Sequence, residues 1–185
     1  VYRQKSTEID FLESKKVENI SGKELLKAAC CNLSESFETS PSVDVSFTDA
    51  VTGTRQIQML GLASPNTQIT RENMPDVRGL SAIYGLTYIP GTWIEGIQVV
   101  KGAGSVVNGF ESIAGQINVN LQRPERMDKL LLNAYVNEGG RLEGNANLRI
   151  DAGNDWGSAL LLHGSYNGVK HDRNKDGFLD MPLSK

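Results

Sequence analysis

The stretch IEGIQVVKGAGSVVNGFESIAGQINV, from Ile94 to Val119, decides the fold of this 185-residue chain. It opens with an alternating apolar run typical of a β-strand, continues through a glycine-rich segment, and closes on a second strand pattern. A glycine-rich segment after a strand can cradle a phosphate, so a nucleotide site is the first interpretation to weigh.

The glycine spacing does not match a nucleotide-binding motif. Gly102 and Gly104 supply the first half of the GxGxxG fingerprint, but Val107 stands where the third glycine belongs. The segment that should form an uninterrupted helix carries Gly109 and Gly115, and no GKS or GKT follows that would make a P-loop. The glycines therefore indicate close backbone approach in a tightly packed domain.

Composition excludes several classes of protein. The chain has 19 Lys plus Arg against 22 Asp plus Glu, without a block of like charges, so we expect no nucleic-acid partner. No apolar run reaches the ~20 residues of a membrane-spanning helix. Membrane β-strands are not excluded, because their apolar residues alternate with polar ones and form no continuous run. The chain has only two histidines and lacks a GxSxG elbow, so its sequence indicates neither a catalytic site nor a zinc site. We therefore predict that the chain is not an enzyme.

The N-terminal half combines one helix with short strands. Residues 19–37 predict a helix, with Ser21 and Glu24 as a capping box and the neighbouring Cys30 and Cys31 as small buried residues near its end. Residues 43–47 and 55–60 alternate as strands. Residues 62–93 are predicted to be irregular, a kind of long segment that is usually functional.

The C-terminal part predicts an antiparallel meander. Strand patterns from Leu130 and from Glu143 are joined by the turn signal EGGRL, and a third strand follows DAGNDWG. Each of the first two strands carries apolar side chains on one face and mainly polar ones on the other: Leu130, Leu132, Ala134 and Val136 in the first, and Ala146, Leu148 and Ile150 in the second. Soluble sheets and membrane barrels share this alternation, so it does not choose between them.

The order of motifs around the glycine-rich segment resembles the closing signature of the plug domain of TonB-dependent outer-membrane receptors. Upstream, the helix, the 43–47 strand and RQIQMLGL with Gly61 resemble the family too, although Met59 and Leu60 replace its usual Ile and Arg. This variant and the paired cysteines look like receptors of Bacteroidetes. The matching signature residues are Ile94, Glu95, Ile97, Val99, Gly102, Ser105, Gly109, Gly115, Ile117, Asn118 and Val119.

The resemblance implies an α+β fold: a small mixed β-sheet with flanking helices, followed by antiparallel strands of a truncated transmembrane β-barrel. The expected domains are a tail or linker at 1–18, the plug at 19–124 and the first barrel strands at 129–185. A ~22-stranded barrel needs more than ~200 residues in strands, so we expect part of a receptor. The structural glycines of the plug would be Gly61, Gly102, Gly109 and Gly115.

The resemblance also implies gated import of a scarce nutrient across the outer membrane, such as siderophore-bound iron, heme or cobalamin. The partners would be that ligand and TonB with its inner-membrane energising complex, and no cofactor would be required. Plug loops would touch the ligand, which makes Arg78, Tyr84, Tyr88 and Trp93 candidate contacts, with packing against the barrel wall or plug core as their alternative role. Thr7–Leu12 is a weak candidate for the TonB box, and could equally be an added strand or a tail.

An acidic run near the C-terminus is a candidate calcium loop. In DRNKDGFLD, Asp172, Asn174, Asp176 and Asp180 take positions one, three, five and nine, and Gly177 takes position six. The twelfth position is a leucine where an EF-hand has a bidentate Glu, so a polar turn is the alternative. With calcium in this loop, the chain could instead be a soluble secreted β-rich binding module.

Overall fold

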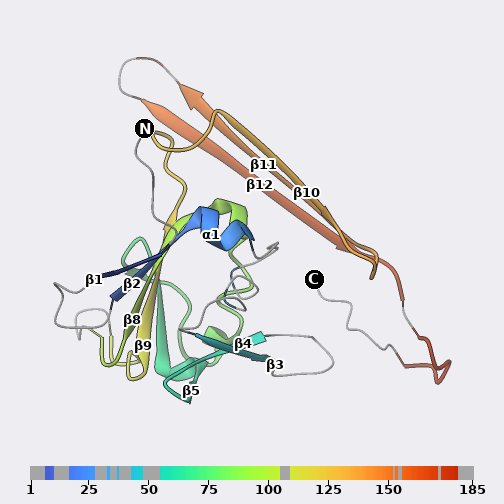
Figure 1. Cartoon of the computed structure of the whole chain (residues 1–185), viewed down its shortest axis with the longest axis horizontal. Coiled ribbons are helices and arrows are strands. Elements are labelled where there is room, and N and C mark those ends of the chain that lie inside the picture. Colours follow the sequence, from blue (N-terminus) through green and yellow to red (C-terminus); the bar gives the residue numbers. More distant parts are fainter. Residues whose placement is uncertain are drawn as a thin grey trace. The chain divides into compact units, whose positions relative to one another are not determined.

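The computed structural model describes residues 7–10, 17–27, 33, 37, 43–47, 55–104, 109–151, 153, 156–170 and 172–178 (Figure 1). The chain divides into two compact units, the first formed by 1–46 with 55–122 and the second by 47–54 with 123–185. This division lies close to the expected end of the plug at residue 124. The expected tail at 1–18 contains one strand and the start of another.

A six-stranded mixed sheet forms the centre of the first unit (Figure 1). Only β6 and β9 run parallel, and the other neighbours are antiparallel. In spatial order the strands are β1 (Thr7–Asp10), β2 (Val17–Ser21), β8 (Ile94–Lys101), β9 (Gly115–Leu121), β6 (Thr67–Arg71) and β7 (Met74–Pro75).

The rest of the first unit is a small second sheet and short helices. Ser21 caps the helix as predicted, since its Oγ accepts the Glu24 N–H at 3.4 Å, and Cys30 and Cys31 lie outside the described residues. No described helix has the length and apolarity needed to cross a membrane. The elements are β3 (Asp44–Phe47), β4 (Arg55–Met59), β5 (Leu62–Ala63), α1 (Gly22–Lys27) and the 3₁₀ helices η2 (Ser64–Asn66), η3 (Gly79–Ile83) and η4 (Gly91–Trp93).

The core of the first unit lies on one face of the mixed sheet. Alternation in β8 and β9 sends Val99, Ile117 and Val119 to this face, where each is fully buried. Ile57 of β4 and Leu25 of α1 belong to the same apolar cluster. Burying a side chain of this size contributes about 1.5–3 kcal/mol, so the core holds the small elements onto the sheet.

The sequence predicted that residues 62–93 are irregular. This prediction is wrong for residues 67–71, which form β6 inside the sheet. The sequence TQITR has one large apolar residue, too weak a pattern to indicate a strand. Pairing with β9 decides the structure here, and the buried Thr70 hydroxyl donates to Asn118 Oδ1 at 2.9 Å.

The second unit contains the predicted meander: β10 (Leu130–Val136), β11 (Arg141–Asp151) and β12 (Gly157–Asn167) pair antiparallel in chain order. Ala134 lies opposite Gly144, which lies opposite Gly164 on the third strand. The register therefore confirms that the predicted apolar positions share one face.

This second sheet exposes the apolar face, which a soluble sheet would bury, and the buried polar side chains lie on its central strand β11. On its apolar face Leu132 is 71% exposed, whereas on its polar face Asn147 of β11 is 2% exposed. Glu143 and Asn145, also on the polar face, are buried as well. A soluble one-sided sheet shows the reverse pattern, and a wall strand of a membrane barrel shows this one.

Candidate functional site

The structure separates two of the residues predicted to contact ligand. Arg78 lies beside the loop that precedes β9, since a Cβ built on Gly109 would be 2.6 Å from its Nη2. Trp93 lies near the other end of β9, where its carbonyl accepts the Gln122 N–H at 2.8 Å. The seven residues of β9 span about 20 Å at ~3.3 Å per residue, so Arg78 and Trp93 do not form one site.

Tyr84 and Tyr88, the two tyrosines predicted to contact ligand, are both exposed and follow η3. The turn that carries them is closed by Thr87, whose N–H and Oγ1 donate to the Tyr84 carbonyl at 2.9 and 2.7 Å. Trp93 is only half-buried, but its indole nitrogen is buried and has no hydrogen-bond partner among the described residues. Tyr84 and Tyr88 are therefore the members of the predicted set whose rings lie most open to a ligand.

The half-exposed Arg78 side chain forms an ion pair within the plug. Its Nε lies 3.6 Å from Glu111 Oε1, and the Glu111 side chain is largely buried. Gly109 has φ +127°, and a Cβ there would lie 2.5 Å from Glu111 Oε2. The glycine thus makes room for an ion pair that ties the segment before η3 to the loop before β9.

The other predicted signature glycines have local geometric roles. Gly61 (φ +76°) completes the two-residue turn between β4 and β5, and Gly102 (φ +93°) follows β8. A Cβ on Gly115 would lie 2.5 Å from both Met59 Cε and the Val100 carbonyl oxygen. Gly115 is therefore the position where close approach of backbone and core excludes any side chain.

A polar network on β9, which sequence analysis missed, fixes the turn after β6. Glu72 and Asn73 have φ of +51° and +63°, a conformation that asparagine tolerates but that is strained for glutamate. The Asn73 N–H donates to Asn118 Oδ1 at 2.9 Å, and the Leu121 N–H donates to Glu72 Oε1 at 2.7 Å. The alternation of Gln116, Asn118 and Asn120 was the available signal for this polar face.

In the candidate calcium loop, the described side chains fold onto their own backbone. The Asp172 carboxylate accepts the N–H groups of Asp176 and Gly177 at 3.2 and 3.0 Å, and Asn174 Nδ2 donates to Asp176 Oδ2 at 2.8 Å. Asp180 lies outside the described residues. Among the described residues no group of three His, Cys, Asp or Glu side chains could hold a metal, so calcium stays a prediction.

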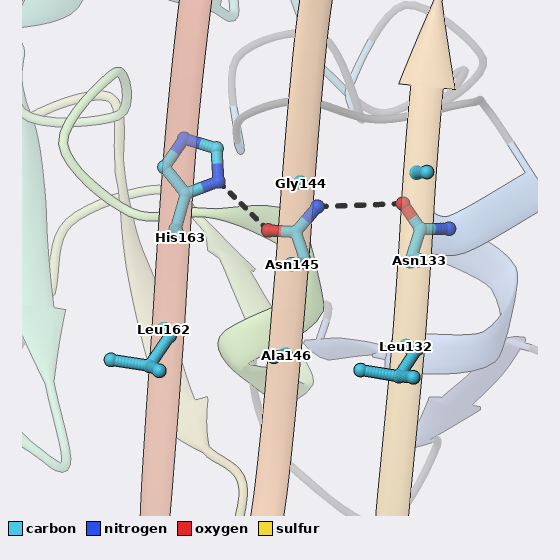
Figure 2. A pocket seen from close by; sticks show the side chains of 8 residues that line it. Leu132, Asn133, Gly144, Asn145, Ala146, Leu162 and His163 are labelled. Atoms are coloured by element: carbon cyan, nitrogen blue, oxygen red, sulfur yellow. Dashed lines mark hydrogen bonds between the residues drawn. The ribbon is translucent and has the colours of Figure 1, made fainter.

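The second sheet carries a row of polar side chains across its three strands (Figure 2). His163 Nδ1 and Asn145 Oδ1 are 2.8 Å apart, and Asn145 Nδ2 donates to Asn133 Oδ1 at 3.4 Å. A shallow hollow of about 410 Å³ lies at the same level, and the apolar-face residues that line it are Leu132, Ala134, Gly144, Ala146 and Leu162. This row gives the polar face of β10–β12 hydrogen bonds in place of apolar packing.

Comparison with protein families identifies the first unit. The model of the TonB-dependent receptor plug domain matches residues 12–116. The chain belongs to this family. The match spans β2 through the start of β9, so the glycine-rich loop is part of the plug. The family is one of transport receptors, and the absence of an enzymatic activity stays a prediction.

Solved receptors share the fold. The ferric-catecholate import receptor Fiu from E. coli K12 has 19% identity and a TM-score of 0.66 over 89% of this chain. The siderophore receptor PiuA from Acinetobacter baumannii has 17% identity and a TM-score of 0.67 over 86%, and the alcaligin outer-membrane receptor FauA from Bordetella pertussis has 17% and 0.66 over 84%. This chain spans 23%, 22% and 27% of those three receptors, respectively.

The search of curated proteins gave no match. The family match confirms the predicted family and, with it, the outer-membrane location. The solved structures confirm the mixed-sheet fold with following antiparallel strands. An origin in Bacteroidetes stays a prediction.

Proposed function

We propose that this chain forms the plug and first wall strands of a receptor that imports a scarce small nutrient across the outer membrane. The observation that carries the proposal is the exposed apolar face of β10–β12, which follows a plug domain in the same chain. A soluble secreted module would need to cover Leu132 and Leu162 with protein, whereas a receptor wall presents them to lipid.

The spacing of aromatic residues supports a lipid-facing wall. Trp156 and Tyr166 are both exposed and stand at opposite ends of β12, ten residues apart. Ten residues of antiparallel strand span about 34 Å, which a tilt of ~40° reduces to about 26 Å along the membrane normal. Membrane barrels carry an apolar band ~25 Å tall between aromatic girdles, so these two residues suit its borders.

The partners would be a small nutrient ligand and TonB with its inner-membrane energising complex, and no cofactor is needed. TonB would move the plug from a blocking to a displaced state. If Thr7–Leu12 is the TonB box, its described part is already β1, paired with β2 at the edge of the sheet. TonB would then add a strand to the other side of β1 or displace it.

Fractionation of the native cells tests the proposal. Antibody against this chain should detect it in the outer-membrane fraction as a band whose migration changes on heating, and nutrient uptake should stop in a strain without TonB. A heat-modifiable band in the membrane with uptake independent of TonB would contradict the energising partner. Recovery in the soluble fraction would contradict the receptor itself.

A further inference from the structure

The Glu72–Asn73 turn joins β6 to β7 and lies beside the end of β9. It is a two-residue turn, because Arg71 pairs with Met74, and both of its residues have positive φ. Turns of this kind favour asparagine at the first position and glycine at the second. Glu72 occupies the first position at φ +51°, which is strained for glutamate, so the turn itself does not account for this residue.

The Glu72 carboxylate takes the place of a backbone acceptor in the β6–β9 ladder. The two strands are parallel, and the Glu72 N–H donates to the Val119 carbonyl at 2.9 Å. In a continued parallel ladder, the next bond would run from the Leu121 N–H to the Glu72 carbonyl. Because the chain turns at Glu72, its side chain supplies the acceptor instead, and the Leu121 N–H donates to Glu72 Oε1 at 2.7 Å.

This bond lies where the chain leaves the plug. Leu121 is the last residue of β9, and Gln122 is the last residue of the first unit. On the side of β8, the Gln122 N–H donates to the Trp93 carbonyl at 2.8 Å and Gln122 Nε2 donates to the Ile94 carbonyl at 3.0 Å. On the side of β6, the described residues hold the strand end through the Glu72 carboxylate. The acceptors are therefore backbone carbonyls on one side and a side chain on the other.

The rest of the turn is anchored independently of this bond. The Asn73 N–H donates to Asn118 Oδ1 at 2.9 Å, which ties the second turn residue to the middle of β9. Just after β7, the Asp76 N–H donates to the Ile69 carbonyl at 3.0 Å, which holds the hairpin closed. Loss of the Glu72 carboxylate would therefore leave the β6–β7 hairpin and the β6–β9 pairing with contacts of their own.

We propose that the Glu72 carboxylate and the Leu121 N–H form an exit contact, a device that opens the end of β9 without unpairing the sheet. Rotation of one side chain removes the acceptor, whereas a backbone acceptor at this place would leave only with its strand. The inference goes beyond the proposed function and does not depend on it, because both groups belong to the first unit. In an import receptor, the exit contact would let the chain loosen where it leaves the plug before the sheet itself is disturbed.

Hydrogen exchange of single amides, measured on the whole chain in detergent micelles, tests the exit contact. The main variant is Glu72→Asn, because asparagine suits this turn position but its side chain is shorter and does not reach Leu121. We expect the Leu121 amide to exchange roughly ten- to hundredfold faster, the loss expected for a hydrogen bond to a charged group. The Asp76 amide, which reports on the hairpin, should exchange as slowly as in wild type or more slowly, because the strain of the turn is relieved.

Two further variants separate the bond from the turn and from the charge. Asn73→Gly gives the second turn position its favoured residue and keeps the Glu72 carboxylate, so the Leu121 amide should exchange as in wild type. Glu72→Gln keeps an acceptor oxygen on a side chain of the same length but removes the charge, so the Leu121 amide should exchange only about fivefold faster. Because Glu72→Gln is the least disruptive change, it also tests the exit contact if Glu72→Asn does not fold.

Three results would overturn the inference. An unchanged Leu121 amide in Glu72→Asn, or in Glu72→Gln if only that variant folds, would mean that the end of β9 is held without the carboxylate. Equal acceleration of the Leu121 and Asp76 amides would mean that Glu72 supports the whole hairpin. The same acceleration in Glu72→Gln as in Glu72→Asn would assign the effect to the charge instead of the bond. All three leave the proposed function intact, because fractionation and TonB-dependent uptake decide it separately.

Discussion

The two large sheets of this protein alternate apolar and polar side chains in the same way, yet only the mixed sheet buries its apolar face. In the mixed sheet of the plug, Val99 and Ile117 are buried against helices and a second small sheet. In the β10–β12 meander, Leu132 and Leu162 are exposed and Asn145 is buried. Alternation with a period of two residues therefore shows that a strand has an apolar and a polar face. The surroundings of the strand decide which of these faces contacts protein.

The largest difference between the sheets should appear on truncating an apolar side chain. Ile117→Ala should lower the free energy of unfolding by about 2–5 kcal/mol, because it leaves a cavity in the plug core. Leu132→Ala, the control on the second sheet, should change it by less than about 0.5 kcal/mol in detergent. Urea unfolding followed by circular dichroism measures both, and similar losses would contradict the assignment of an outward apolar face.

Replacing a glycine by alanine also compares the two sheets, because the added methyl group needs free space around it. Gly115→Ala should cost about 1–3 kcal/mol, because the new Cβ would overlap Met59 and the Val100 carbonyl. Gly164→Ala on β12 meets nothing within 4 Å and should be neutral within about 0.5 kcal/mol. Thermal melts of the two variants decide this, and a neutral Gly115→Ala would show that the plug core yields at this point.

Calcium should stabilise the second unit alone. If the Asp172 loop binds it, calcium at ten times the dissociation constant should add about 1.4 kcal/mol. Asp176→Asn should remove the effect, since the loop loses a charged oxygen ligand, and magnesium at equal concentration is the matched control. Calorimetric titration without heat from calcium would leave the loop as a polar turn closed by its own hydrogen bonds.

The smallest expected effect concerns the turn between β4 and β5 of the plug. Leu60→Asn should stabilise the plug by about 1 kcal/mol, because asparagine tolerates positive φ better than leucine. Thermal melts measure the change, with Leu62→Asn beside the same turn as the control. An unchanged or lower stability of Leu60→Asn would contradict the strain assigned to Leu60.

Sequence patterns were sufficient where neighbouring residues carry the information. The strands around Ile97, Ile117 and Leu132 and the Ser21 cap follow from local alternation and spacing, and the glycine order pointed to the plug family. These features depend on backbone periodicity and on glycine's freedom of φ, both of which can be read from a few adjacent residues.

Other features arise only when distant segments meet. TQITR becomes β6 because β9 pairs with it and Asn118 satisfies Thr70, partners 48 residues apart. Arg78 and Trp93 fall in one segment of sequence, but the sheet carries them to opposite ends of β9. The sequence by itself determined the family and the alternating strands; the tertiary structure decided which faces are buried and which loops share an end, because both depend on contacts between residues far apart in the chain.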